Sequence, residues 1–104
     1  MKMNVDDLIW FDTQNCFIDG CWQKPKSDNY ISLIDPSDGQ EICKIARSMK
    51  DDVDLSVASA KNALSGEWGN YTALDRSRML QKIRNVVKEK IDVLAKLESL
   101  DVGK

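Results

Sequence analysis

The stretch at residues 72–104 reads TALDRSRMLQKIRNVVKEKIDVLAKLESLDVGK, and the rest of the chain is organised around it. Thr72 and Asp75 have the spacing of a helix start, because a hydroxyl and a carboxylate can accept hydrogen bonds from unpaired backbone N–H groups. Gly103 is suited to end the last turn, where a left-handed backbone costs glycine little. Apolar residues recur every three or four positions and so share one side of a helix: Met79, Leu80, Ile83, Val86 and Val87. Such a stripe must be covered by other polypeptide.

Two helical regions follow from the same spacing. We expect residues 72–102 to form a helical pair that breaks near residue 90, with Asp92 capping the final helix. A separate helix is predicted over 51–65, with Asp51 as its cap and further acids at its positive end. The apolar face of that helix contains Val53, Val57, Ala60 and Leu64.

The preceding segment, residues 15–47, is predicted to contain two β-hairpins. Asp19-Gly20 favours a two-residue turn, because both positions tolerate positive φ angles. Residues 30–34 are rich in β-branched and aromatic side chains and are typical of a strand. The next turn begins at Asp35-Pro36, where proline presets φ and the aspartate can bond back to the backbone. Residues 41–47 return as the partner strand, although their apolar spacing would also suit a helix.

Length and composition indicate one soluble domain, in which residues 1–14 form a loosely held leader. The chain has 104 residues, of which 42% are hydrophobic and 31% charged, with a net charge of -2. This balance does not favour binding to nucleic acid or to a membrane surface. No apolar run approaches the roughly 18 residues that span a bilayer, and acids stand where a signal peptide would be apolar. The expected location is therefore cytoplasmic.

No residue pattern, considered alone, predicts a catalytic site. The chain has three cysteines. It has no histidine, and this absence excludes Ser-His and Cys-His arrangements. The three cysteines contain no C-x-x-C pair, so we expect small packed thiols rather than a disulfide or zinc site. The acids at 51–54 are explained by their place at a helix start, and the basic residues at 76–90 by a solvated helix face. Trp22 and Trp68 are expected to be core anchors.

Six short motifs occur in order over residues 17–104. They are Phe17-Ile-Asp-Gly-x-Trp22, Ile34-Asp35-Pro36-x-x-Gly39, Asp51-Asp-Val53-Asp54, Trp68, Arg76-x-Arg78-x-Leu80 and Leu97-Glu98-x-Leu100-Asp101-x-Gly103-Lys104. Taken together, they resemble the N-terminal portion of the aldehyde dehydrogenase superfamily, closest to its betaine aldehyde dehydrogenase-like branch. Asp19 and Asp35 stand where the family usually has asparagine. The fold class expected is α+β, with two short hairpins followed by three helices, as an N-terminal piece of that family's α/β fold.

The resemblance implies that full-length relatives oxidise aldehydes to acids with NAD or NADP. They use a cysteine nucleophile, a glutamate base and an asparagine oxyanion donor, all in segments beyond residue 104. None of Cys16, Cys21 and Cys43 matches the family nucleophile. We therefore expect no catalytic residue and no cofactor site in this single partial domain, residues 1–104.

One family site can be transferred by residue. Some members hold a monovalent cation with backbone carbonyls just before the Asx-Pro turn and with the aspartate of Leu-Asp-x-Gly-Lys. These positions are Leu33, Ile34 and Asp101 here, and oxygen ligands suit a hard cation. Asp101 is equally well explained as a polar residue in the last turn of a helix.

Three hypotheses about function follow. The first is a truncated aldehyde dehydrogenase-like protein that is inactive alone, either a gene remnant or a shortened reading frame. The second is a non-catalytic interaction module whose exposed apolar helix faces bind a second copy or a full-length aldehyde dehydrogenase. The third is an unrelated small helical binding domain. The first two share one premise, that the helices at 52–64 and 79–100 lack part of their cover.

Overall fold

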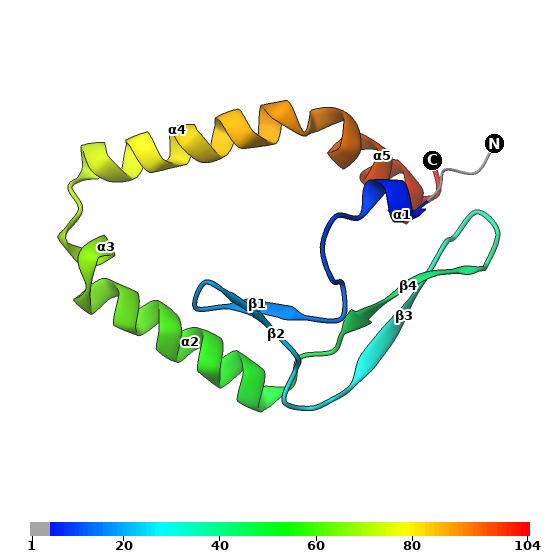
Figure 1. Cartoon of the computed structure of the whole chain (residues 1–104), viewed down its shortest axis with the longest axis horizontal. Helices are drawn as coiled ribbons and strands as arrows, with labels where there is room; N and C mark the ends of the chain where they lie inside the picture. Colours follow the sequence, from blue (N-terminus) through cyan, green and yellow to red (C-terminus); the bar gives the residue numbers. More distant parts are fainter. Residues whose placement is uncertain (1–4) are drawn as a thin grey trace.

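The structure is a computed structural model that describes residues 5–104. Figure 1 shows an open ring: the long helices form an arc, and the two hairpins and the N-terminal segment complete the circuit. Part of the predicted leader, residues 1–4, lies outside the described residues. The elements are α1 (Val5–Leu8), β1 (Cys16–Ile18), β2 (Cys21–Gln23), β3 (Tyr30–Ile34), β4 (Glu41–Ala46), α2 (Lys50–Ser65), α3 (Glu67–Asn70), α4 (Ala73–Glu89) and α5 (Ile91–Val102).

Both predicted hairpins are confirmed. β1 and β2 pair antiparallel with Phe17 opposite Trp22, and the connecting residues Asp19 and Gly20 have φ angles of 55° and 74°. These positive values are the ones that a tight two-residue turn requires. β3 and β4 also pair antiparallel, with a register shift between Leu33 and Ile34. The helical alternative for residues 41–47 is therefore wrong, because the second strand is fixed by pairing with the first.

The turn between β3 and β4 is held by the side chain and backbone of Asp35, which is 1% exposed. Its carboxylate Oδ1 accepts hydrogen bonds from the backbone N–H of Ser37 at 2.8 Å and from the Ser37 hydroxyl at 2.7 Å. Its carbonyl accepts the N–H of Gly39 at 2.8 Å. The predicted back-bonding aspartate is confirmed, and it fixes the turn that α5 approaches.

The α4 cap is confirmed in both directions. The hydroxyl of Thr72 accepts the N–H of Asp75 at 3.1 Å, and the Asp75 carboxylate accepts the N–H of Thr72 at 3.0 Å. Gly103 ends α5 with a φ of 78°, in the left-handed region as expected.

Two other cap predictions are wrong. α2 begins one residue earlier than expected, with Met49 at the N-cap, so Asp51 lies inside the first turn. Asp52 carries out the capping instead, because its carboxylate accepts the N–H of Met49 at 3.2 Å. Asp92 also lies inside its helix, because Lys90 both ends α4 and begins α5. The break leaves no extended residue at position 92 to act as a cap.

Two helices were not expected from the sequence. α1 and α3 are single turns of four residues each. A periodic pattern needs a window of roughly 11 to 18 residues to be recognised, so a single turn leaves no such signal. The three long helices and two hairpins agree with the predicted α+β class. In the part of the chain that the structure describes, no helix is long and apolar enough to cross a membrane.

Asp52 joins α2 to the loop after the first hairpin. The side chain is 2% exposed and accepts the backbone N–H of Lys26 at 2.8 Å. This hydrogen bond is the main cause that lowers the pKa of Asp52 below its ordinary value of 3.8, and it outweighs the opposing effect of burial. The ionised form is therefore the one that stabilises the folded state.

We expect Asp52→Asn to lower the urea midpoint, and the size of this loss to depend on pH. A folded-state pKa below the unfolded value contributes stability that is complete above pH 3.8 and disappears as pH falls through the folded pKa. The gap between wild type and variant should therefore be constant near neutral pH and shrink below pH 3.8. Denaturation followed by circular dichroism at several pH values measures this gap. Asp51→Asn, at an exposed neighbouring position, is the control and should show no comparable gap.

The ring is a single layer of secondary structure. The radius of gyration is 16.9 Å and the principal extents are 49 × 34 × 18 Å, whereas a compact domain of this length has a radius of gyration of about 13 Å. Domains are normally built from at least two packed layers around a core. Among the described residues, the buried hydrophobic residues of the core are Leu8, Ile18 and Leu100. The core is therefore small for the length of the chain.

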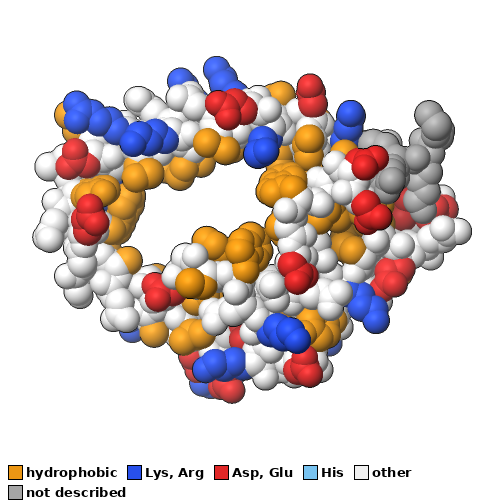
Figure 2. Space-filling model, viewed as in Figure 1, with side chains coloured by type: hydrophobic (Ala, Val, Ile, Leu, Met, Phe, Trp, Pro, Cys, Tyr) orange, Lys and Arg blue, Asp and Glu red, His pale blue; other side chains and the backbone are white. Residues whose placement is uncertain are grey.

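The inner edge of the ring is apolar. Figure 2 shows hydrophobic side chains along the opening, including the inner side of α4, while most charged side chains point outward. Leu80, Ile83, Val86 and Val87 of the predicted stripe are 47–63% exposed. Trp22 and Trp68 are 52% and 37% exposed, so their prediction as core anchors is wrong for this chain. Each of these side chains therefore lies on a face that the described residues leave at least partly uncovered.

Candidate functional site

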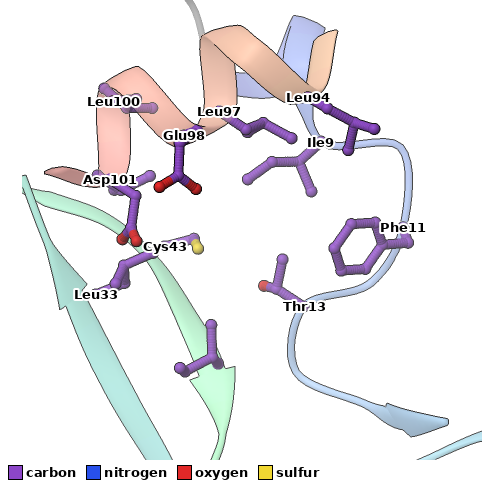
Figure 3. A pocket seen from close by; sticks show the side chains of 12 residues that line it. Ile9, Phe11, Thr13, Leu33, Cys43, Leu94, Leu97, Glu98, Leu100 and Asp101 are labelled. Atoms are coloured by element: carbon purple, nitrogen blue, oxygen red, sulfur yellow. The ribbon is translucent and has the colours of Figure 1, made fainter. Parts of the chain in front are cut away.

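A groove lies between α5, the β3–β4 hairpin and the segment before β1. Its volume is about 470 Å³. Figure 3 shows Leu94 and Leu97 on its α5 side and Phe11 and Thr13 on the opposite side. The lining is mainly apolar, and the carboxylates of Glu98 and Asp101 point from α5 toward the hairpin. The periodicity of α5 and the pairing of the hairpin position this groove.

Two of the three residues predicted to hold a monovalent cation meet in this groove. Leu33 and Asp101 both line it. Ile34 is next to Leu33 in β3, and its side chain is 48% exposed. The register shift between Leu33 and Ile34 disrupts the hydrogen-bond ladder, which can free backbone carbonyls for other partners. The donor set, carbonyl oxygens and one carboxylate, fits a hard monovalent cation, and the cation site itself stays a prediction.

The groove contains a thiol but no histidine that could activate it for covalent chemistry. Cys43 lines it and is a free thiol, but the chain has no histidine that could act as its base. The sulfur of Cys16 lies 2.9 Å from the Ser48 hydroxyl oxygen, within hydrogen-bond distance. Among residues 5–104, no group of three or more histidine, cysteine, aspartate or glutamate side chains is placed to hold a metal ion.

Sequence reasoning missed an aromatic array beside the groove. Phe11 stacks on Trp22 with ring centroids 5.5 Å apart, and Trp22 contacts Phe17 at 5.0 Å. Trp10 contacts Phe11 at 5.4 Å, and the Lys90 ammonium lies 5.4 Å from the centre of the Trp10 ring. The array therefore links the N-terminal segment to the first hairpin and to the α4–α5 junction. The hairpin register could have revealed one pair, because a turn at 19–20 places residues 17 and 22 opposite each other.

A second aromatic contact holds the corner between α3 and α4. The guanidinium of Arg76 lies 5.2 Å from the centre of the Trp68 ring and donates to the Trp68 carbonyl at 3.2 Å. Trp68 also contacts Tyr71 at 5.6 Å. The negative charge of Glu67 raises the pKa of Tyr71, whose hydroxyl donates to that carboxylate at 3.2 Å. These residues orient α4 and form no reactive centre.

Comparison with known proteins shows which family this chain is similar to. The sequence pattern of the aldehyde dehydrogenase family matches residues 22–104. The chain is 38% identical over 88 residues to an aldehyde dehydrogenase of Rhodospirillum rubrum, covering 85% of this chain and 17% of that protein. It is 33% identical over 93 residues to betaine aldehyde dehydrogenase of Bacillus subtilis, covering 88% of this chain and 19% of that protein.

Solved structures give the same result. The crystal structure of betaine aldehyde dehydrogenase from Staphylococcus aureus in complex with NAD+ matches with a TM-score of 0.88 and 30% identity, over 97% of this chain and 20% of that one. The 104 residues thus span about one fifth of the length of the relatives they match. On the family match and these relatives together, the chain belongs to the aldehyde dehydrogenase family.

Proposed function

We propose that these 104 residues form a scaffold segment of an aldehyde-oxidising enzyme and have no dehydrogenase activity on their own. The observation that supports this most directly is the single-layer ring with an apolar inner edge. An apolar stripe such as that of α4 is stable in water only when other polypeptide covers it. We assign that cover, together with the nucleophile, base and nucleotide site, to the four fifths of the family fold that this chain does not span.

This proposal also concerns the cofactor and the location. The Staphylococcus aureus relative was crystallised in complex with NAD+, and we propose that NAD or NADP serves the whole enzyme while this segment does not bind it alone. We also propose a cytoplasmic location, since the net charge of -2 gives the chain no general attraction to a membrane surface.

The test is a direct assay of the purified chain. We expect no NADH formation above the no-protein background with betaine aldehyde or acetaldehyde, and no heat of NAD binding by calorimetry. The intact Bacillus subtilis relative is the positive control. NADH formation by the wild-type chain above that background would contradict the proposal. Turnover that persists after all three cysteines are replaced by serine would also exclude a cysteine nucleophile.

A second candidate function is a non-catalytic module that associates with another copy or with an aldehyde dehydrogenase. The exposed stripe of α4 favours it, because exposed apolar surface of this extent is typical of interaction sites. The net charge of the chain, -2, is too small to prevent such association by electrostatic repulsion. Size-exclusion chromatography with light scattering separates association with a second copy from association with another protein.

A further inference from the structure

We infer that this chain binds in trans only to aldehyde dehydrogenase polypeptide whose own matching segment is absent or not yet docked, and does not bind the folded enzyme. The inference rests on the proposed scaffold function and names the partner of the apolar inner edge. The partner is a polypeptide of the same family, recognised through hydrophobic burial rather than through charge.

The surface that would bind is the inner stripe of α4 together with the aromatic array. Among the described elements, none packs closely along α4, which makes few contacts with the others. Its stripe residues are about half exposed, with Ile83 at 53%. In the array, Phe17 is 60% exposed and Trp22 52% exposed. Removing large apolar side chains from water on binding is favourable, and tryptophan is among the residue types that contribute most to interface energies.

The partner surface is already occupied in a folded relative. The chain matches the Staphylococcus aureus enzyme with a TM-score of 0.88 over 97% of its length. The folded relative therefore contains a segment of its own in the same conformation, with the same helices and hairpins. The complementary surface for this chain is the surface that this segment covers. A folded enzyme consequently presents no vacant site for a second copy of it.

Competition between the two segments favours the one that is covalently attached. A tethered segment has an effective concentration of about the millimolar range, whereas a separate chain in solution is present at far lower concentration. Exchange would also require the covered apolar surface to be exposed first. Binding in trans should therefore be limited to two partners. One is an enzyme polypeptide that lacks the matching segment, and the other is an enzyme polypeptide whose own segment has not yet packed in place.

The test uses tagged chain and the Bacillus subtilis relative, which is 33% identical over the matching 93 residues. One partner lacks its matching N-terminal segment and is refolded together with the chain; the other is the intact, folded enzyme mixed with the chain. We expect the shortened partner to be recovered on the tag at least about 10-fold better than the intact one, a ratio that corresponds to roughly 1.4 kcal/mol. Equal recovery of the two would overturn the inference.

A matched pair of variants tests the surface. Ile83→Asp places a carboxylate in the inner stripe and should abolish recovery of the shortened partner. Asn85→Asp adds the same side chain two positions later, about 200° around a helix of 3.6 residues per turn, and should leave recovery unchanged. Both positions are exposed in the chain, so each variant can be checked for wild-type helix content by circular dichroism. Equal loss in both, or in neither, would contradict the assigned surface.

A covalent fusion separates this inference from the proposed function. The chain is joined to the shortened relative, and NAD-dependent aldehyde oxidation is measured. An active fusion, combined with failure of the separate chains to associate, leaves the scaffold function standing and overturns the inference. A fusion that is soluble and inactive counts against the scaffold function itself.

Discussion

Replacing Gly69 with alanine is expected to disrupt the corner between α2 and α3 and to cause the largest loss of stability of any single methyl addition in the chain. A Cβ at position 69 would lie 1.7 Å from the carbonyl oxygen of Leu64 and 2.7 Å from its carbonyl carbon. These are backbone atoms of α2, so no side-chain rotation can relieve the overlap. Overpacking of a well-packed site typically costs about 1–3 kcal/mol, and an overlap with the backbone should lie at or above the upper end of that range.

The neighbouring Gly66 supplies the control. Its Cβ would meet the carbonyl oxygens of Asn62 and Ala63 at 3.6 and 3.8 Å, which are ordinary van der Waals contacts, and its φ of −105° is open to any residue. Gly66→Ala should therefore keep the urea midpoint of the wild type, while Gly69→Ala lowers it and reduces helix content in the far-ultraviolet spectrum. Equal midpoints for the two variants would show that the corner is not packed as described.

Two elements could be predicted from short sequence patterns alone, namely the first hairpin and the start of α4. The Asp19-Gly20 turn fixes the first hairpin, and the paired bonds between Thr72 and Asp75 fix the start of α4. Each of these depends on residues three or fewer positions apart, so the local pattern was enough to predict it. The start of α2 is different, because Asp52 is oriented by the backbone N–H of Lys26, a residue 26 positions away. A cap that depends on such a contact cannot be read from the local pattern.

Burial was the property that the sequence predicted least well. Trp22 and Trp68 have the composition of core residues, yet they are 52% and 37% exposed. The hydrophobic pattern reports which face must be covered and gives no information about whether the covering polypeptide belongs to the same 104 residues. The candidate cation residues are a second case in which the sequence pattern alone did not predict the spatial arrangement. Leu33 and Asp101 are brought together by the approach of α5 to the hairpin, and only the family resemblance had placed them near each other.

That approach of α5 to the hairpin gives the second large effect, at Gly103. Its φ of 78° lies in the left-handed region, where a side chain costs about 1–2 kcal/mol. A Cβ there would also lie 2.9 Å from Cγ of Pro36, an atom of a stiff ring in the turn that begins at Asp35. We therefore expect Gly103→Ala to lower stability by the backbone cost plus about 1 kcal/mol or more for the contact, measured as a shift in the urea midpoint.

The two contributions can be separated, because Gly39 has nearly the same backbone without the contact. Its φ is 74° and a Cβ there would meet nothing within 4 Å, so Gly39→Ala should show the backbone cost alone. Shortening Pro36 to alanine removes Cγ, and a double-mutant cycle between Pro36→Ala and Gly103→Ala should recover the additional loss. Losses that simply add in this cycle would show that α5 does not rest on the Asp35-Pro36 turn.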